Sequence, residues 1–463
     1  PSGSLTMAKR QTGVVVTSAG TGYRSGDTVT AAFLNGGQTN VVLSGVRLAS
    51  NVSGGLTKTG MGSLALTAAN TYSGVTLLSD GSLQAQDGAG LPTGSFLSLN
   101  GGVLQGTGTF SRALGTSGSS KVQWTTNGGG FSANGGQMTV TINGGTDELT
   151  WGTSVGSQLV GPLKFGSTTA NAKTLFQNGI DLCAANRTVD VTAGAGGDAA
   201  EISGVIRTSS GMAGLIKTGN GKLILSGANT YSGGTVVSNG TFAFGSQDAA
   251  ANAGVITLTS GATYDLGGFA VTNTSLSASS ATIKNGTLFA PSFVFSGGSV
   301  SATLAGPVAL TNNSGTLVLS GLNAYTGGTF LNGGTVSVSS DDNLSGVGTA
   351  LTFNGGWLQV TGTTLCNLDN HRVNWGSFNG GLDIANTGNT FVVTSNLTTS
   401  AVFSKAGAGT LVWTNNTVTV TGGGLQVRGG TLSLANATYR DTANVIDSVG
   451  KYAGDVATLR IQT

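Results

Sequence analysis

The sequence predicts an all-β protein made of stacked coils of short strands, with almost no helix. The 463 residues include 80 glycines, 5 prolines and only 8% charged residues. Short segments alternate small polar with branched apolar residues, and longer signature segments recur along the chain. Because a short strand followed by a turn cannot bury its apolar face alone, stacked coils are what give such a chain a continuous core.

Composition excludes several other classes of protein. A collagen triple helix needs glycine at every third position with abundant proline, and a disordered chain would carry more charge and fewer β-branched residues. The 20 basic and 18 acidic residues offer no basic face for a phosphate backbone, so we expect no nucleic-acid partner. Polar residues interrupt every apolar run, and no transmembrane segment is expected.

The expected strands are short and are separated by tight turns. Residues 139–142, 223–225, 317–319 and 417–421 alternate with a period of two, which is typical of half-buried strands. Stacked coils would let Ser, Thr and Asn at identical positions form hydrogen-bonded ladders. Asn-Gly-Gly turns, which tolerate positive φ angles, begin at Asn35, Asn100, Asn127, Asn134, Asn143, Asn332, Asn354 and Asn379.

An internal repeat is the most specific signal. The sequence from Gly55 reads GLTKTGMGSLALTAANTYSGVT, and the sequence from Gly214 reads GLIKTGNGKLILSGANTYSGGT, an offset of 159 residues. A third copy from Ser314 lacks the lysine, and a fourth from Lys405 keeps only the first half. We therefore predict an N-terminal β segment (1–53), solenoid modules at 54–213, 214–307 and 308–438, the last holding the degenerate fourth copy, and a more charged C-terminal segment (439–463).

This signature resembles the autotransporter-associated β-strand repeat, or passenger-associated repeat, of bacterial secreted surface proteins. The match covers about 30 residues at Gly55 and again at Gly214, and it weakens at Ser314. The resemblance implies a right-handed parallel β-helix that is secreted and lies outside the cell or on its surface, as in autotransporter passenger domains. The segment GTGYRSGDTVT from Gly20 is similar to a short repeat of very long secreted proteins.

The residues shared by the copies are the candidate structural positions. We expect each tyrosine to cover a coil edge, each asparagine to satisfy backbone groups at the corner, and each lysine to be solvated or to bond a turn carbonyl. The alternative is that the tyrosines form an exposed ladder that stacks on sugars. These positions are Lys58, Asn70, Tyr72, Gly74, Lys217, Asn229, Tyr231, Gly233, Asn323, Tyr325 and Gly327.

The two cysteines, Cys183 and Cys366, hold equivalent positions, because each follows a leucine and precedes an arginine-containing strand. In a straight solenoid they would lie several coils apart, whereas a disulfide needs Cα atoms within about 7 Å. An intrachain disulfide is therefore not expected. Either both are small buried hydrophobic residues, or they form an intermolecular contact between stacked subunits.

Few residues could carry chemistry, so we predict no catalytic, cofactor-binding or metal-binding residues and no enzyme. The adjacent acid pairs Asp147–Glu148 and Asp341–Asp342 lie in turn-like settings and are expected to be solvated rather than to hydrolyse glycosides. His371, the sole histidine, has Asp369 nearby, but no nucleophile-elbow motif supports a Ser-His-Asp site. One histidine and two cysteines offer little for metal ligation.

Two classes of function stay open. The preferred one is an extracellular structural β-solenoid of a bacterial surface, which forms or contributes to a fibre, filament, sheath or adhesive stalk. The alternative is a carbohydrate-binding or polysaccharide-degrading β-helix, which a cleft lined by three or more of the few acidic and basic residues would favour. The expected partners are further copies of the chain, joined into a homo-oligomeric fibre or layer, and surface polysaccharide. No cofactor is expected.

Overall fold

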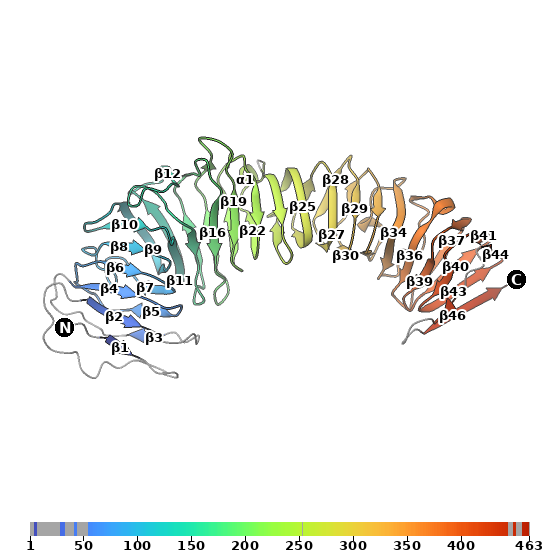
Figure 1. The fold of residues 1–463 in the computed structure, drawn as a ribbon, viewed down its shortest axis with the longest axis horizontal. Coiled ribbons are helices and arrows are strands. Elements are labelled where there is room, and N and C mark those ends of the chain that lie inside the picture. The colour runs from blue at the N-terminus through green and yellow to red at the C-terminus, as the bar shows by residue number, and fades with distance from the viewer. Residues whose placement is uncertain are drawn as a thin grey trace. The chain divides into compact units, whose positions relative to one another are not determined.

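The computed structural model describes residues 54–251, 253–442, 448–450 and 456–462, together with the backbone of β1 (Ser4–Thr6), β2 (Thr28–Ala32) and β3 (Val41–Leu43). The predicted fold class is confirmed, because the chain forms a parallel β-solenoid of about 18 turns with almost no helix (Figure 1). Residues 20–27 of the GTGYRSGDTVT segment lie outside the described residues. No helix among the described residues is both long and apolar enough to cross a membrane.

The chain divides into two compact units, residues 1–254 and 255–463. In the first unit, parallel strands from successive coils stack on one another (Figure 1). After β3 its elements are β4 (Gly55–Lys58), β5 (Ser63–Leu66), β6 (Thr76–Leu78), β7 (Ser82–Ala85), β8 (Leu97–Leu99), β9 (Val103–Leu114), β10 (Lys121–Trp124), β11 (Gly129–Ile142), β12 (Leu149–Thr150), β13 (Leu163–Phe165), β14 (Lys173–Phe176), β15 (Ile180–Asp181), β16 (Arg187–Val191), β17 (Ala199–Ile202), β18 (Ile206–Arg207), β19 (Leu215–Thr218), β20 (Lys222–Leu225), β21 (Thr235–Val237), β22 (Thr241–Phe244) and the short helix α1 (Gln247–Ala251).

The second unit has the same construction. β23 (Gly254–Leu258) begins at the boundary between the units. The following elements are β24 (Thr263–Asp265), β25 (Ala270–Lys284), β26 (Thr287–Phe289), β27 (Phe293–Val300), β28 (Thr303–Gly306), β29 (Leu310–Asn312), β30 (Thr316–Leu319), β31 (Ala324–Tyr325), β32 (Thr329–Leu331), β33 (Thr335–Val338), the 3-10 turn η1 (Asp341–Asn343), β34 (Ala350–Val360), β35 (Arg372–Val373), η2 (Trp375–Ser377), β36 (Asn379–Ile384), β37 (Thr390–Val393), β38 (Leu397–Thr399), β39 (Phe403–Ala406), β40 (Thr410–Thr414), β41 (Thr417–Val420), β42 (Leu425–Val427), β43 (Gly430–Ala435), β44 (Thr438–Asp441), β45 (Ser448–Val449) and β46 (Ala457–Gln462).

Columns of inward-facing side chains form the core. One column in the first unit runs through five successive parallel pairings, and each of its members is at most 1% exposed. Burying a side chain of this kind contributes about 1.5–3 kcal/mol of transfer free energy, so the core grows with every coil added. The column consists of Leu64, Leu83, Leu104, Phe131, Phe165 and Val191.

The predicted alternating segments are strands in the structure. Residues 139–142 end β11, 223–225 lie in β20, 317–319 lie in β30, and 417–420 form β41. Asparagines of successive turns also stack: Asn354 Nδ2 donates to Asn332 Oδ1 at 3.3 Å, and Asn332 Nδ2 donates to Asn313 Oδ1 at 3.2 Å. The ladders expected from superposed polar residues are therefore present on this corner.

The repeat signature does not stay on one face of the solenoid. In the first unit, β5 of the first copy is continued by β7, β9, β11, β13 and β16 up to β19, which is the first strand of the second copy. In the second unit, β30 of the third copy is continued by β33, β34 and β36 up to β39, the first strand of the fourth copy. The signature thus advances by one strand position between the first and second copies and again between the third and fourth.

The described part of the C-terminal segment continues the same coils. β44 pairs with β41, and β46 pairs with β43, in the parallel register of the preceding turns. Arg440 and Arg460 are exposed on these strands, whereas Asp447, Lys451 and Asp455 lie outside the described residues. The described strands of this segment are therefore part of the same stack of parallel strands.

Candidate functional site

The repeated lysine is buried inside the solenoid and ties two coils together. Lys58 ends β4 in the inward column that Leu78, Leu99 and Trp124 continue, and it is fully buried. Its Nζ donates to the carbonyls of Thr59 at 2.9 Å and Gly60 at 2.5 Å in its own turn. A third bond, of 3.0 Å, reaches the Asp80 carbonyl in the next coil. The aliphatic stem therefore fills a core position while the ammonium holds two successive turns.

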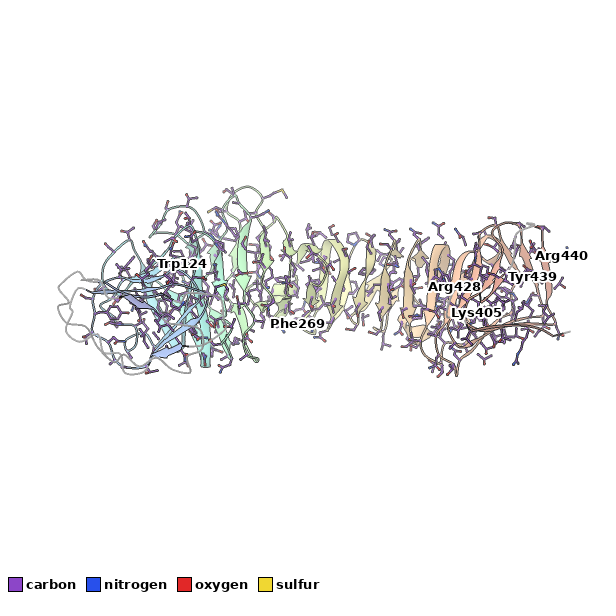
Figure 2. All side chains as sticks on the ribbon, turned by 60° about the horizontal axis from the view of Figure 1, so that its bottom comes forward. Trp124, Phe269, Lys405, Arg428, Tyr439 and Arg440 are labelled. Carbon is purple, nitrogen blue, oxygen red and sulfur yellow. The ribbon has the colours of Figure 1, made fainter. Side chains whose placement is uncertain are left out.

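The same arrangement recurs at the other two repeat lysines. Lys217 donates to Thr218, Gly219 and, in the next coil, Asn239, at 2.6, 2.8 and 3.1 Å. Lys405, which is labelled in Figure 2, donates to Ala406, Gly407 and Gly429 at 2.6, 2.7 and 2.9 Å. Each lysine is fully buried, so none of the three is a solvated side chain. We call each such lysine with its three carbonyls a lysine cage.

Burial controls the electrostatics of the cages. It lowers the pKa of each caged lysine from 10.5 to about 8, and one nearby aspartate opposes the effect. Each ammonium therefore keeps its proton at neutral pH, where its three N–H groups match the three carbonyl acceptors. The aspartates that raise the pKa are Asp80 beside Lys58, Asp190 beside Lys217 and Asp383 beside Lys405.

The third copy replaces the lysine with an asparagine. Asn312 pairs with Leu331 as Lys58 pairs with Leu78, so it occupies the same position in the coil. It is fully buried, and its Nδ2 donates to Gly315 at 3.3 Å and to Gly333, in the next coil, at 3.0 Å. The turn that follows Asn312 is one residue shorter, which lets the shorter amide reach carbonyls on the same two coils.

A glycine at the far side of each cage permits its geometry. Gly81 has φ 62°, and a Cβ there would lie 2.5 Å from the Gly60 carbonyl oxygen and 2.7 Å from Lys58 Nζ. Any side chain would therefore collide with the cage as well as strain the backbone. The corresponding residues in the other copies also have positive φ: Gly240, Gly334 and Gly430.

The repeat asparagines hold the opposite corner. Asn323 accepts from the Leu304 amide of the preceding coil at 2.9 Å and donates to the Asn343 carbonyl of the following coil at 2.6 Å. Asn229 accepts from the Ile206 amide at 2.8 Å, and Asn70 donates to the Gly90 carbonyl at 2.9 Å. These side chains bond backbone groups of neighbouring coils, the role that we expected of them.

Each repeat tyrosine bonds a threonine four residues later. The hydroxyl pairs Tyr72–Thr76 and Tyr325–Thr329 measure 2.8 and 2.7 Å, and both rings are at most 1% exposed. Tyr231 is half-buried and makes the same contact. Burial raises the pKa of Tyr72 and raises the pKa of Tyr231 to about 12. The alternative of an exposed, sugar-stacking ladder is therefore wrong for Tyr72 and Tyr325.

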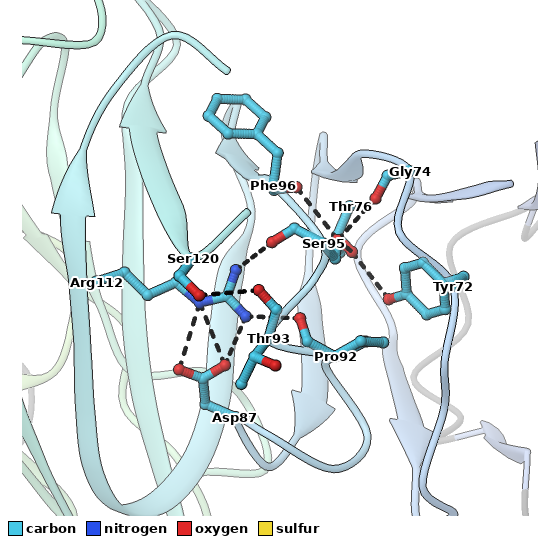
Figure 3. Close-up of polar contacts among 10 residues, drawn as sticks. All are labelled: Tyr72, Gly74, Thr76, Asp87, Pro92, Thr93, Ser95, Phe96, Arg112 and Ser120. Atoms are coloured by element: carbon cyan, nitrogen blue, oxygen red, sulfur yellow. Dashed lines mark hydrogen bonds and ion pairs between the residues drawn. The ribbon is translucent and has the colours of Figure 1, made fainter. Parts of the chain in front are cut away.

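In the first copy this hydroxyl network reaches a buried arginine (Figure 3). Thr76 contacts Ser95 at 2.7 Å, and the Ser95 carbonyl accepts from Arg112 at 2.5 Å. Arg112, 3% exposed, also forms a 2.6 Å ion pair with Asp87 and donates to the Pro92 carbonyl at 2.9 Å. The arginine thereby fixes the loop between β7 and β8.

The repeat glycines lie where consecutive coils approach closely. Gly74 donates its amide to the Gly54 carbonyl at 3.0 Å. A Cβ at Gly233 would lie 2.4 Å from the Ala213 carbonyl carbon, and one at Gly327 would lie 2.4 Å from the Ala309 nitrogen. Their role is thus to let two backbones touch.

Neither cysteine is a buried hydrophobic residue. Cys183 is half-buried with φ 55°, and Cys366 is exposed; both are free thiols. Burial and the neighbouring Asp181 raise the pKa of Cys183. The alternative of two buried hydrophobic cysteines is therefore wrong, and Cys366 is the more exposed of the two.

The candidate acidic residues make local contacts. Glu148 is exposed and forms an ion pair with Arg207. Asp341 accepts from His371 Nε2 at 2.9 Å, so the partner of the histidine is this aspartate and not Asp369. Within the described ranges, no three His, Cys, Asp or Glu side chains gather as a metal site would require.

One comparison with known proteins falls on the four segments that hold the cages. The family model of the passenger-associated-transport-repeat matches residues 56–85, 215–244, 312–338 and 403–434. The four segments are thus similar to this repeat. Each matched segment spans strands of two successive coils and contains the lysine cage or its asparagine substitute, together with the glycine that the cage requires.

One curated relative also matches. The chain is 55% identical over 49 residues, which is 11% of its length, to the "Adhesin BmaC autotransporter" of Brucella suis biovar 1 (strain 1330). The chain spans only 1% of the length of that relative. No solved structure matches.

Proposed function

We propose that the chain is an extracellular β-solenoid segment of a bacterial surface protein, with a structural and adhesive role rather than an enzymatic one. The passenger-associated-transport-repeats and the short match to an autotransporter adhesin support a secreted or cell-surface location. The observation that carries the proposal is the repeated cage: in all four copies one buried polar side chain joins two coils. Such links between coils would help an extracellular segment to stay folded in the absence of chaperones.

Location can be tested on intact bacteria. Antibodies raised against the purified chain should label the outside of unpermeabilised cells in immunogold electron microscopy. Labelling that appears only after permeabilisation would contradict the proposal.

We further propose that copies of the chain associate into a fibre or layer. Support comes from the stacked parallel strands and from the exposed thiol of Cys366, which is accessible for a contact between chains. Electron microscopy of the purified protein over a range of concentrations should show assemblies. Only dispersed single particles at every concentration would reject this part of the proposal.

Carbohydrate binding is the second candidate function. In the second unit, a hollow of about 330 Å³ is lined by Asp369, His371 and Arg372, three of the few titratable residues in the chain. That combination is the feature expected of a carbohydrate-binding β-helix. Binding of glycans by the purified chain, measured by saturation-transfer NMR, tests this candidate.

A further inference from the structure

The hollow in the second unit lies between the turn that precedes β35 and the strand β37 of the next coil. Its volume of about 330 Å³ falls within the range of about 300–1,000 Å³ that is usual for small-molecule sites. Its polar lining includes Asp369 and Arg372 from the first wall and Thr394 and Ser395 from the second, with Trp375 beside them.

The first wall of the hollow is the turn of residues 368–371, which precedes β35 and is anchored by hydrogen bonds to Asp341. Asn370 Nδ2 and His371 Nε2 donate to the two carboxylate oxygens of Asp341, at 2.7 and 2.9 Å. The His371 amide donates to the Leu368 carbonyl at 2.9 Å. Residues 370 and 371 are thus anchored to a neighbouring coil, while the side chains on either side of them remain exposed.

Those two exposed side chains carry opposite charges and have no partner within the described part of the chain. Asp369 uses only its amide, which donates to Asn367 Oδ1 at 3.0 Å, and its carboxylate makes no hydrogen bond or ion pair there. The Arg372 guanidinium is likewise unpaired among the described residues. The hollow therefore offers a carboxylate acceptor and a guanidinium donor that a ligand can use without breaking an existing bond.

The second wall is fixed to the first and to the core. The Val392 amide donates to the Cys366 carbonyl at 2.7 Å, which joins the two walls. Trp413 Nε1 donates to the Ser395 carbonyl at 2.7 Å. The hydroxyls of Thr394 and Ser395 are therefore presented from a backbone that is already positioned.

An aromatic ring completes the hollow. Trp375 stacks on Phe378 with ring centroids 5.4 Å apart and an interplanar angle of 15°, and it forms a T-shaped pair with Trp413 at a centroid distance of 5.3 Å. The indole remains half-buried where it lines the hollow. An aromatic surface held in this way can pack against the C–H groups of a ligand at little cost in entropy.

We propose that this hollow binds one pyranose unit of a surface glycan. The Asp369 carboxylate accepts hydrogen bonds from neighbouring hydroxyls, Arg372 donates to sugar oxygens, and Trp375 packs against the C–H face of the ring. A sugar presents donors, acceptors and apolar C–H groups within a few ångströms, which matches this mixed lining. The inference rests on the second candidate function above and names its site.

Saturation-transfer NMR on the purified 463-residue chain tests the site. The probes are the methyl glycosides of galactose, N-acetylglucosamine and glucuronic acid. At least one of them should receive saturation from the protein. D369N and R372Q should each weaken that binding by about tenfold, the effect of losing one charge-assisted hydrogen bond. D147N, which changes an exposed aspartate in the first unit, is the matched control and should bind as the unmodified chain does.

Two results would overturn the proposal. Absence of transfer to all three glycosides would reject sugar binding at this hollow. Binding that survives in both D369N and R372Q would place any sugar elsewhere on the chain. Circular dichroism of each variant shows whether it is folded, and the exposed positions of both residues make unfolding unexpected. A negative NMR result would not change the immunogold result, so sugar binding and cell-surface location are tested independently.

Discussion

Lys405 Nζ donates to the Gly429 carbonyl across a distance of 2.9 Å, so one side chain links two coils that are 24 residues apart in the sequence. Buried lysines are rare unless paired with an acid, yet this ammonium is satisfied by backbone carbonyls alone. The arrangement uses the carbonyls left free at the turns, groups that would otherwise need water. It makes the lysine a structural residue of the solenoid.

Removing the ammonium should loosen the two coils that it joins. K58M keeps the buried stem but leaves three carbonyls without a donor, and we expect a loss of about 2–4 kcal/mol in the free energy of unfolding. Urea denaturation followed by circular dichroism measures it. K121M is the matched control, because Lys121 is half-buried and makes no side-chain hydrogen bond among the described residues. Equal stability of the two variants would contradict the role of the cage.

The cages should also shape the dependence of stability on pH. The pKa of the caged lysines is about 8 in the folded chain and 10.5 in the unfolded chain. Above about pH 8 the unfolded chain therefore holds more protons, and the free energy of unfolding should rise with pH. Above about pH 10.5, where the unfolded lysines also lose their protons, the trend should reverse, because the unfolded tyrosines ionise while burial keeps the pKa of Tyr231 at about 12.

Urea midpoints measured between about pH 8 and pH 10 test this sign. The triple variant K58M/K217M/K405M should lose most of the rise. A rise of the same size in that variant would show that other groups cause it.

Tyr325 and Thr329 should be energetically coupled. Y325F and T329V each leave one buried hydroxyl without its partner, whereas the double variant removes both groups. We expect each single variant to lose about 1 kcal/mol and the double variant to lose less than the sum. A double-mutant cycle of unfolding free energies measures the coupling, and strictly additive losses would argue against it.

Gly81 should tolerate substitution worse than another glycine with a similar backbone. G81A combines a strained φ of 62° with a Cβ placed 2.5 Å from the Gly60 oxygen. Gly135 has φ 80°, but no heavy atom lies within 4 Å of the place that a Cβ would take, so G135A measures the backbone strain alone, about 1 kcal/mol. G81A should lower the melting temperature clearly more than G135A does.

Cys366 should be the cysteine that responds to oxidants. It is exposed, whereas Cys183 is half-buried with a raised pKa. Mild oxidation should produce a disulfide-linked dimer on a non-reducing gel, and C366S should abolish that band while C183S preserves it. A dimer band in C366S, or monomer in every lane, would remove Cys366 as a contact between chains.

Much of this fold could be predicted from the local sequence. Alternation identified the strands at 223–225 and 317–319, and the recurring signature identified the coils, because stacked coils place similar demands on each turn. The lysines of the copies could be located but not assigned to the core, since an ammonium is usually solvated. The lysines can be buried because the next coil supplies a carbonyl acceptor, and no spacing in the sequence predicts that acceptor.

Other parts of the site needed the three-dimensional register. Asn312 could not be matched to Lys58, because the following turn is a residue shorter and the residue types differ. The pairing of Arg112 with Asp87 crosses coils of unequal length. The hollow beside Trp375 is lined by residues of two coils, and no sequence motif in either coil predicts it.

Between the first and second copies, and between the third and fourth, the repeat advances by one strand position, and this shift has a consequence for how the gene can change. Recombination between the two copies of such a pair joins part of one cage to part of another, so the coils at the junction can still form a cage. The surface downstream, however, is turned by one strand position against the surface upstream. Gain or loss of a repeat can therefore bring different faces of the protein into line with one another without altering a single coil.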